Sequence, residues 1–435
     1  MRVKPVFVAN RTGGVYCHPD GTREALSGEA VVERAGHLAT QLGRSLEWRA
    51  SLLDYALVTS REELVDLMTD LHRADAVLLY FLGEVPVDIL VRSSLPLIGF
   101  SGPATPLFAV INLEPERRTR DDITIASSYR DIDEEIFLLA ARKAVRETTV
   151  ALVGYPLSTR LMHLPSLTRA QERLGVRFKL KEVRELVERM SSVPDDRARS
   201  VAQAWLEGAR DVAGPGEQQV LSVARAYVAM RGLLQEEHAN AMAINCLDMF
   251  RNLGGPAPCF AVTKLRDDGI QAACELDVVA LLTMLVLGHA AHAPVFMGNV
   301  VTIDTEEDVL GLSHCVTPTR LRGYGQEASP YWLRDYHGSD VGVTGHVHLE
   351  AGQQVTIGRL SQDLERMLLF RGELVECSET GICRTTLRVR VEDARRFLDS
   401  VTGNHHMLVL GDYVTRTKAL CSRFGITGTG LDSAS

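Results

Sequence analysis

Short apolar runs separated by helical patterns are the feature of this sequence that most constrains its fold. In the first hundred residues, strand-like runs occupy 5–9, 55–59, 76–82 and 95–99. Amphipathic patterns over 27–42 and 61–71 separate the first three of these runs. Strands that alternate with helices are typical of a parallel sheet covered by helices. We therefore expect an α/β domain over residues 1–147.

The same alternation begins again after residue 147. A buried strand pattern, TTVALVG, covers 148–154, and further strands are predicted at 178–183 and 241–246. The helices predicted between them cover 195–207 and 217–237. This pattern predicts a second α/β domain over 148–300.

Alternating polar and apolar residues dominate the last third of the chain. The alternating runs lie at 342–348, 353–360, 367–376 and 385–391. They are joined by turns that contain glycine, which is typical of antiparallel strands. We expect a β-rich C-terminal domain over 301–435.

The composition excludes several classes of partner. The 435 residues are 46% hydrophobic and 24% charged, with a net charge of −9, and no long basic block is present. Nucleic acid is therefore not an expected partner. The most apolar stretch, 278–297, contains Gly288, His289 and His292, so we expect no membrane span. The N-terminal residues turn polar after a short strand-like run, so we also expect no signal peptide and a cytoplasmic protein.

Eight cysteines are spread from Cys17 to Cys421 without a CxxC pair. Several lie inside apolar segments. This distribution predicts buried, reduced thiols, and it implies neither a disulfide framework nor a structural zinc site.

The stretch 256–314 carries most of the candidate chemistry, because acids and histidines interrupt otherwise apolar sequence there. Residues 259–265 are predicted as a short strand and 267–269 as a turn. Glu275 and Asp277 then precede a helix that is apolar on most sides and should be buried. One acid at a helix start is usually a cap, but two acids that flank a single leucine fit a metal-ligand pair equally well.

Three other positions add candidate side chains. Asp248 ends the run AMAINCLD, where a strand would carry it to the edge at which open α/β sheets bind ligands; the alternative is a helix cap. His314 lies in a loop that follows a strand. His405 and His406 precede the apolar run 407–410, and successive strand residues point to opposite faces, so at most one of the two faces a site.

Taken together, Glu275, Asp277, His314 and His406 offer oxygen and nitrogen ligands without a thiolate. Such a set suits Mn²⁺ or Mg²⁺ better than structural zinc.

Six segments resemble the L-fucose isomerase and L-arabinose isomerase superfamily, and especially its divergent fucose-isomerase-like branch. In family order they are PCFAVTKLRDDGIQAACELDVVALLTML, APVFMGNVVTID, LSHCVTP, GQQVTIGRL, CRTTLRV and GNHHMLVLGDY, within residues 240–425. The resemblance implies two Rossmann-like α/β domains followed by a β-rich domain, and a divalent ion, usually Mn²⁺. It also implies interconversion of an aldose with its ketose, a small-molecule sugar substrate and a homo-oligomer.

The resemblance also implies residue roles. Asp277 matches the acid ligand of the family's ELD-like motif, and His406 matches the histidine of its GNHH motif. His314 resembles the additional histidine ligand of arabinose isomerases. The expected metal ligands are therefore Asp277, His314 and His406, and the expected catalytic acids are Asp248, Glu275 and Asp277.

Two positions depart from the family pattern. Met249 stands where this branch carries a glutamate that serves as ligand and base, and Asp248 could replace it only if the backbone shifts by one residue. Asn299 stands where the family carries an acid. Three hypotheses follow: a metal-dependent sugar isomerase, a relative recruited for epimerisation or carbon–oxygen cleavage, and a non-catalytic sugar-binding protein.

Overall fold

The computed structural model describes residues 1–10, 13–17, 22–46, 50–83, 87–100, 113, 117, 120, 122–155, 164–380 and 383–430. The chain divides into two compact units, Met1–Ala141 and Arg142–Ser435. The first unit contains one parallel sheet. The second contains another parallel sheet and an antiparallel barrel-like sheet.

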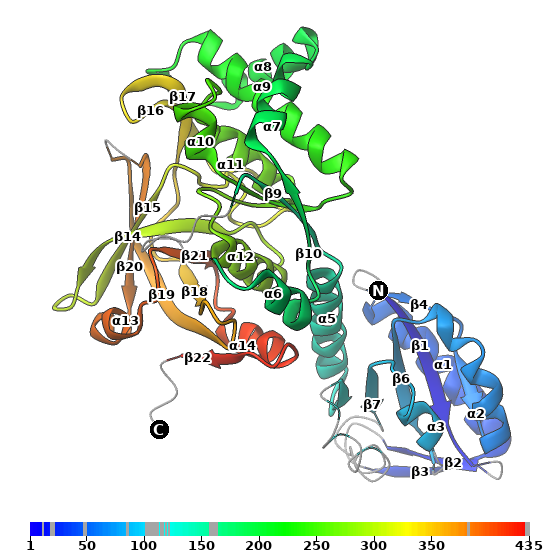
Figure 1. Ribbon diagram of the computed structural model, residues 1–435. Helices are drawn as coiled ribbons and strands as arrows, with labels where there is room; N and C mark the ends of the chain where they lie inside the picture. Colours follow the sequence, from blue (N-terminus) through cyan, green and yellow to red (C-terminus); the bar gives the residue numbers. More distant parts are fainter. Residues whose placement is uncertain are drawn as a thin grey trace. The chain divides into compact units, whose positions relative to one another are not determined.

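The sheet of the first unit is parallel, as the sequence predicts. Its strand order is β4-β1-β6-β7-β8, and β5 pairs with β1. Strands β4, β1, β6 and β7 are labelled in Figure 1. The strands are β1 (Arg2–Val8), β4 (Ser51–Leu52), β5 (Ala56–Val58), β6 (Ala76–Phe81), β7 (Leu97–Phe100) and β8 (Ile123–Ile125). A separate hairpin pairs β2 (Gly13–Cys17) with β3 (Arg23–Ser27).

Helices cover both faces of this sheet, which explains why its strands are continuously apolar. On one face, Phe7 packs in a cluster with residues of α1 and α5; on the other, Val6 packs with residues of α2 and α3. Successive strand residues point to opposite faces, so each strand needs apolar residues at every position. The helices are α1 (Gly28–Leu46), α2 (Arg61–Met68), η1 (Leu71–Arg73), α3 (Asp88–Val91) and α5 (Tyr129–Arg146).

The parallel sheet of the second unit has the order β10-β9-β12-β13. Its strands are β9 (Thr149–Val153), β10 (Arg177–Lys181), β12 (Ala241–Ile244) and β13 (Gln271–Ala273). The associated helices are α6 (Leu167–Leu174), α7 (Val183–Ser191), α8 (Asp195–Gly208), α9 (Glu217–Glu236), α10 (Cys246–Arg251) and α11 (Cys259–Asp267).

Helix α11 corrects one prediction, because residues 259–265 were expected to form a strand. Nearly every residue of α11 is buried, including Phe260, Val262 and Arg266. A short helix that is buried on all sides has no 3.6-residue alternation, and its apolar run cannot be distinguished from a buried strand by pattern.

The last third forms an antiparallel sheet that closes on itself. The order β18-β21-β14-β15-β20-β19 returns to β18 through the pairing of β18 with β19, and β22 joins β19 in parallel. The strands are β14 (Phe296–Asp304), β15 (Val309–His314), β18 (Gln354–Leu360), β19 (Arg366–Ser378), β20 (Thr385–Val391), β21 (His405–Leu410) and β22 (Thr427–Thr429). Phe296, Ile357 and Leu408 share one buried cluster with Phe397 of α13 (Ala394–Ser400). The predicted antiparallel strands are thus confirmed.

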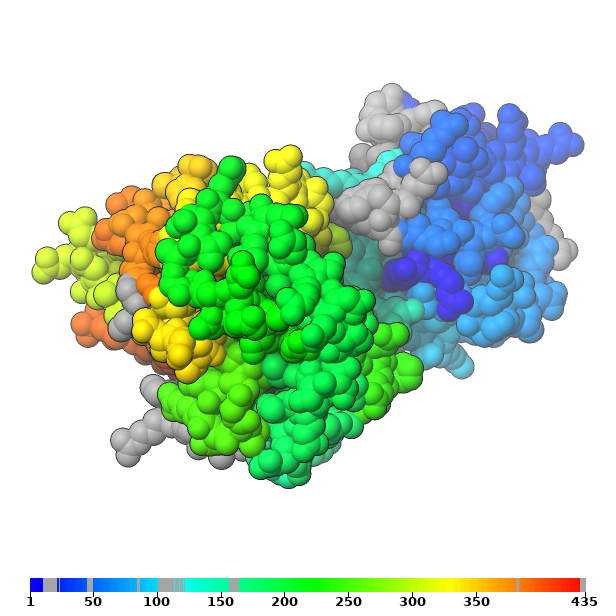
Figure 2. All heavy atoms as spheres, turned by 90° about the horizontal axis from the view of Figure 1, so that it is seen from above, coloured from blue at the N-terminus to red at the C-terminus, as the bar shows by residue number. Residues whose placement is uncertain are grey.

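A small sheet joins β11 (Val212–Ala213) to the hairpin of β16 (Tyr331–Tyr336) and β17 (Ser339–Val347). Strand β17 contacts α9 and α11. In Figure 2 the green residues of the second unit lie beside its yellow and orange residues. Strand β14 crosses the predicted boundary at residue 300, and the division into three domains stays a prediction.

Helix α12 (Val278–Ala291) lies between the parallel sheet and the barrel, as Figure 1 shows. It contacts β13 on one side and β18, β21 and α14 (Val414–Ser422) on the other. All its residues except His289 are buried, which confirms the prediction of a buried helix. The N-terminus of α12 therefore brings the acids that precede it to the edge of the barrel.

The seven cysteines whose side chains are described are all free, and most of them are buried, as predicted. In the part of the chain that the structure describes, no helix combines the length and apolar character needed to cross a membrane.

Candidate active site

Glu275 lies in the turn that joins β13 to α12, and the backbone of this turn is unusual. The φ angles of Glu275 and Leu276 are 57° and 52°, the left-handed region that residues other than glycine rarely adopt. Such residues cost about 1–3 kcal/mol each and persist only where the surrounding fold enforces them. The Leu276 amide donates to Ile244 O (2.9 Å) and the Asp277 amide to Cys274 O (3.1 Å). These bonds fix the turn beside the end of β12.

His314 and His405 come from strand ends that the barrel places side by side. His314 ends β15 and His405 begins β21. Strand β14 lies between them, and its Asn299 pairs with Ser313 on one side and with His405 on the other. The two imidazole centroids are 5.6 Å apart. Barrel pairing thus brings together two histidines that are distant in the sequence.

Glu275 faces both imidazoles. Its Oε1 lies 4.0 Å from His314 Nε2, and its Oε2 lies 3.7 Å from His405 Nε2. Both histidines are buried, whereas the Glu275 side chain is 29% exposed. Within the described residues, neither Nε2 atom has a hydrogen-bond partner. Glu275 is therefore the member of this set that a small molecule can reach, and two buried nitrogen atoms face it.

Asp277 lies behind His405 and orients it. Its Oδ1 accepts a hydrogen bond from the Ala280 amide (2.9 Å) and so caps α12, while its Oδ2 accepts one from His405 Nδ1 (2.9 Å). Arg359 of β18 places Nη1 3.5 Å from the same oxygen, and it donates to Thr402 O and His405 O. With its proton on Nδ1, His405 directs the Nε2 lone pair toward Glu275.

Electrostatics favour an ionised Asp277 and a neutral His314. Burial acts to raise the pKa of Asp277, but the His405 hydrogen bond and the charge of Arg359 lower it below its usual value. Burial holds the pKa of His314 well below its usual value, and the positive charge of Arg266 acts in the same direction. A neutral imidazole such as His314 is a suitable metal ligand at neutral pH, and an ionised Asp277 accepts the hydrogen bond that orients His405.

The carboxylate of Glu275 and the two imidazoles can supply three ligands to one divalent ion, since their ligand atoms lie within 4.8 Å of one another. Two ligands about 2.1 Å from a common ion lie about 3.0–3.4 Å apart, so we expect these side chains to move closer together when an ion binds. His314 Nδ1 accepts a hydrogen bond from the Val316 amide (3.2 Å), so Nε2 carries the proton of the neutral ring. Coordination through Nε2 requires the tautomer with its proton on Nδ1. We therefore expect the hydrogen bond from the Val316 amide to Nδ1 to break when an ion binds.

The structure brings together only part of the expected ligand set. Glu275 and His314 are adjacent, and Asp277 reaches the group through His405. His406 lies elsewhere: its ring is 4.9 Å from that of Phe397 inside the barrel. Because β21 presents alternate residues to opposite faces, only one histidine of the pair faces the acids. That histidine is His405 and not His406.

Asp248 is neither at a strand end nor a helix cap. It lies in the first turn of α10, whose cap is Asn245, and its Oδ1 accepts a hydrogen bond from Asn252 Nδ2 (2.6 Å). Cys246 of the same helix contacts the site, because its Sγ accepts a hydrogen bond from the Glu275 amide (3.4 Å). Helix α10 therefore borders the site, and the catalytic role of Asp248 stays a prediction.

The two positions that depart from the family pattern have structural contacts. Met249 is fully buried, and its side chain packs against Gly255. Asn299 accepts a hydrogen bond from the Asn404 side chain and so ties β14 to the residues before His405. Met249 therefore contributes to packing, and Asn299 supports the strand pair that carries His405.

Sequence reasoning missed Arg359, which lies in the segment GQQVTIGRL but was assigned no role there. Its full burial beside Asp277 depends on the pairing of β18 with β21.

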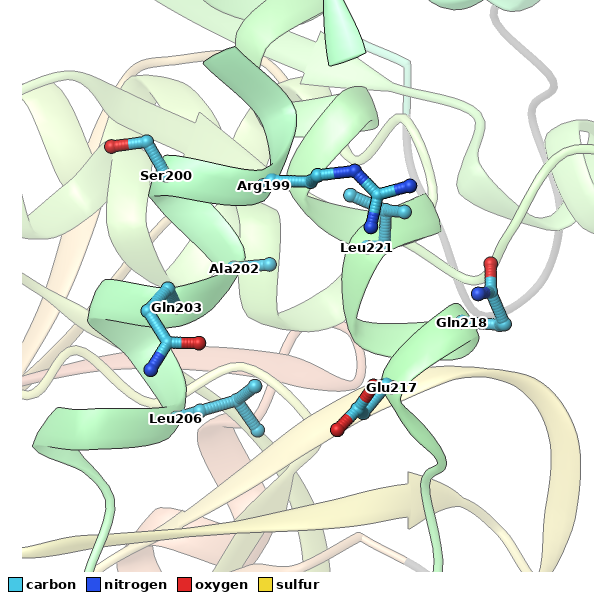
Figure 3. Close-up of a pocket in the computed structure, with 8 residues that line it drawn as sticks. All are labelled: Arg199, Ser200, Ala202, Gln203, Leu206, Glu217, Gln218 and Leu221. Atoms are coloured by element: carbon cyan, nitrogen blue, oxygen red, sulfur yellow. The ribbon is translucent and has the colours of Figure 1, made fainter. Parts of the chain in front are cut away.

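A hollow between α8 and α9 is a separate feature, lined by side chains that include Arg199, Gln203 and Glu217 (Figure 3). None of the acids or histidines of the site lines it.

Comparison with known proteins relates the chain to sugar isomerases. It is 31% identical over 152 residues to a protein named sulfoquinovose isomerase from Alkalicoccus urumqiensis, covering 34% of this chain and 33% of that protein. It is 25% identical over 308 residues to the sulfoquinovose isomerase of Priestia megaterium, covering 64% and 63%. It is 22% identical over 275 residues to that of a Clostridium species, covering 61% and 59%.

The matched segments span from a third to just under two thirds of these curated relatives. No family model matches the chain. The chain is therefore similar, over part of their length, to proteins that all carry the name sulfoquinovose isomerase.

Proposed function

We propose that this chain is a divalent-metal-dependent isomerase that interconverts a sugar aldose with its ketose. The observation that carries the proposal is the convergence of Glu275, His314 and His405, with two buried nitrogen atoms that have no hydrogen-bond partner among the described residues. The names of the similar proteins support a sugar substrate and an isomerisation.

Glu275, His314 and His405 would hold the ion, and Mn²⁺ suits their oxygen and nitrogen atoms. When bound, such an ion would supply Lewis-acid polarisation of a substrate carbonyl and would stabilise negative charge on the substrate oxygens. This assignment replaces Asp277 and His406 as expected direct ligands, because Asp277 lies behind His405 and His406 lies inside the barrel.

The remaining chemistry is positioning and proton transfer. Asp277 and Arg359 hold His405 in one orientation, which preserves the direction of its Nε2. Isomerisation moves a proton between neighbouring carbons and needs a group that accepts and returns it. Glu275 is the partly exposed carboxylate of the site, and we propose it for this transfer; Asp248 of the bordering helix is the second candidate.

We propose a sulfonated aldose as the first substrate to test, because the similar proteins are named for sulfoquinovose. The experiment incubates chelator-treated protein with sulfoquinovose, with and without Mn²⁺, and follows the ketose by NMR. We expect ketose only with Mn²⁺, loss of turnover in Glu275→Gln, and full turnover in His348→Ala, a partly exposed histidine outside the site.

The alternative hypotheses predict other outcomes of this experiment. An epimer in place of a ketose would support the recruited relative. Sugar binding without any conversion, at full Mn²⁺ occupancy, would support the sugar-binding protein and contradict our proposal.

A further inference from the structure

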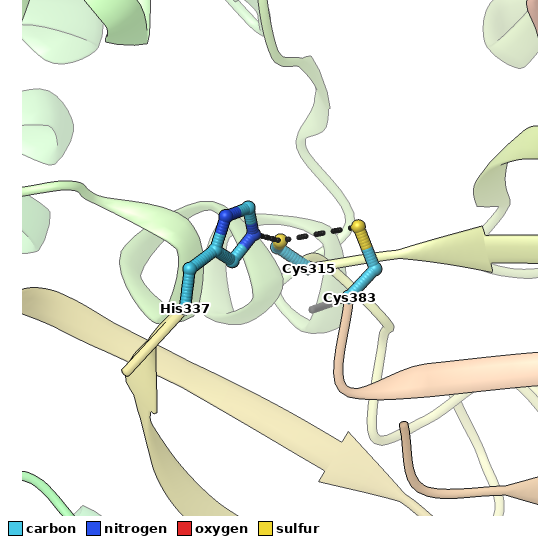
Figure 4. Close-up of side chains that lie close together, drawn as sticks. All are labelled: Cys315, His337 and Cys383. Carbon is cyan, nitrogen blue, oxygen red and sulfur yellow. Dashed lines mark hydrogen bonds between the residues drawn. The ribbon is translucent and has the colours of Figure 1, made fainter. Parts of the chain in front are cut away.

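A second group of possible metal ligands contains two thiols, and one of them, Cys315, directly follows His314 in the sequence. Cys315 Sγ is 3.0 Å from His337 Nε2 and 3.6 Å from Cys383 Sγ (Figure 4). The three ligand atoms all lie within 4.8 Å of one another. The mechanism proposed above uses none of these side chains.

These residues come from separate elements. Cys315 follows β15, His337 lies at the tip of the β16–β17 hairpin, and Cys383 precedes β20. Cys259, at the start of α11, belongs to the same buried cluster as Cys315. The sequence therefore has none of the short cysteine spacings that indicate a zinc site, which is why the pattern did not predict one.

The hairpin tip holds His337 over the thiols. Tyr336 pairs with Ser339, and the two residues between them, His337 and Gly338, have φ angles of 54° and 74°. Such a two-residue turn usually contains Asn-Gly, so histidine replaces the preferred first residue. The imidazole stacks on Tyr336 at 4.1 Å, and the Gly338 amide donates to Asp335 Oδ1 (2.6 Å). These contacts fix the ring toward Cys315.

We propose that Cys315, His337 and Cys383 form a second metal site, for Zn²⁺ or a similar thiophilic divalent ion. Thiolates about 2.3 Å from a tetrahedral ion lie about 3.8 Å apart, and the Sγ–Sγ distance here is 3.6 Å. A sulfur and an imidazole nitrogen on such an ion lie about 3.5 Å apart, so the 3.0 Å hydrogen bond would open slightly. Cys315, His337 and Cys383 would supply three ligands, and water can complete the tetrahedral set.

The burial of these three side chains fits a structural metal ion and leaves a route by which the ion can enter. Cys315 is buried, Cys383 is partly buried and His337 is exposed, so an ion can reach the thiols from the side of His337. Bound there, it would tie the hairpin and the start of β20 to the residue that follows His314. A Cys315–Cys383 disulfide would use only two of these groups and would leave the contact between His337 and Cys315 unexplained.

Cobalt substitution separates this site from the Glu275 site. A Co²⁺ ion bound by thiolates gives an intense sulfur-to-metal charge-transfer band, and the Glu275, His314 and His405 set has no thiolate. We expect reduced, metal-stripped protein to bind one equivalent of Co²⁺ with this band, which one equivalent of Zn²⁺ then abolishes. The Glu275→Gln variant should keep the band.

Two variants and one control localise the ion. His337→Asn removes the imidazole but suits the turn, so it should fold normally and weaken Zn²⁺ binding by at least about tenfold. Cys383→Ser should strongly reduce the band. Cys377→Ser is the matched control, because this partly buried thiol bonds to Val347 O outside the cluster and should leave the band unchanged.

The proposal is overturned if the reduced wild type shows no charge-transfer band, or if His337→Asn and Cys383→Ser bind Zn²⁺ as the wild type does. It is also overturned if mass spectrometry finds a Cys315–Cys383 disulfide and the reduced protein binds no Zn²⁺. None of these results bears on the isomerase proposal, which depends on a different set of ligands.

Discussion

His405 and His406 are neighbours in sequence but face opposite sides of β21. Strand alternation is a local property, so the sequence alone predicts that only one of them faces the acids. Which one does so depends on the pairing of β21 with β14, where Asn299 lies opposite His405 and Gly298 opposite His406. That register is set by contacts distant in sequence, and the family motif did not supply it.

The first prediction distinguishes these two histidines. His405→Ala should lose most Mn²⁺ binding, because Nε2 of His405 faces Glu275. His406→Ala should keep Mn²⁺ affinity and lower the free energy of unfolding by about 2–4 kcal/mol, since it leaves a cavity beside Phe397. Isothermal titration with Mn²⁺ and denaturant unfolding measure both effects. The opposite order of effects would place the site inside the barrel.

The second prediction compares the two acids that flank Leu276. Glu275→Gln should abolish Mn²⁺ binding because it removes the only carboxylate among the three proposed ligands. Asp277→Asn should weaken binding by about 10–100-fold, the usual effect of losing a partner that orients a ligand. Asparagine can also cap α12, so the fold should survive. A larger loss in Asp277→Asn would show that Asp277, the acid favoured by the family motif, contacts the ion directly.

At the level of helices and strands, predictability depends on how many sides of an element are buried. Strands β19 and β20 of the barrel alternate buried and more exposed residues, and this alternation predicted them. Helices α11 and α12 are buried on nearly all sides, so neither shows a helical period. The 14 residues of α12 are too many for a typical buried strand, so its length indicated a helix. The 9 residues of α11 do not exclude a strand by length, and α11 was wrongly predicted to be one.

The third prediction concerns β14, the strand between the two histidines. A Cβ at Gly298 would lie 2.8 Å from Phe296 Cε1 and 2.9 Å from Leu312 Cβ, closer than packed atoms allow. Gly298→Ala should therefore cost about 1–3 kcal/mol of stability and weaken Mn²⁺ binding by shifting β15 relative to β21. Gly325→Ala is the control, because nothing lies within 4 Å of its Cβ. Equal stability and affinity in the two variants would mean that β14 does not position the site.

At the scale of the whole molecule, the alternation of elements predicted both parallel sheets and the β-rich end. It did not predict that the second sheet and the barrel form one compact unit, because that depends on packing around α12. Glu275, His314 and His405 all belong to this unit, Arg142–Ser435. The homo-oligomer that the resemblance implies stays a prediction.

The fourth prediction concerns the division of the chain into two compact units. A chain that begins at Arg142 should bind Mn²⁺ with the affinity of the full chain, because every proposed ligand and the orienting Asp277 and Arg359 lie within it. Circular dichroism establishes that the fragment is folded, and equilibrium dialysis measures the ion. A folded fragment without Mn²⁺ affinity would mean that the first unit contributes to the site.

The most direct test is crystallographic: anomalous scattering at the manganese edge from crystals soaked in Mn²⁺. We predict a peak bonded to Glu275, His314 Nε2 and His405 Nε2, with Asp277 outside the ligand shell and His406 distant from it. A manganese peak bonded to His406 or directly to Asp277, or no peak at these residues at saturating Mn²⁺, would contradict the proposed metal site and the isomerase mechanism that depends on it.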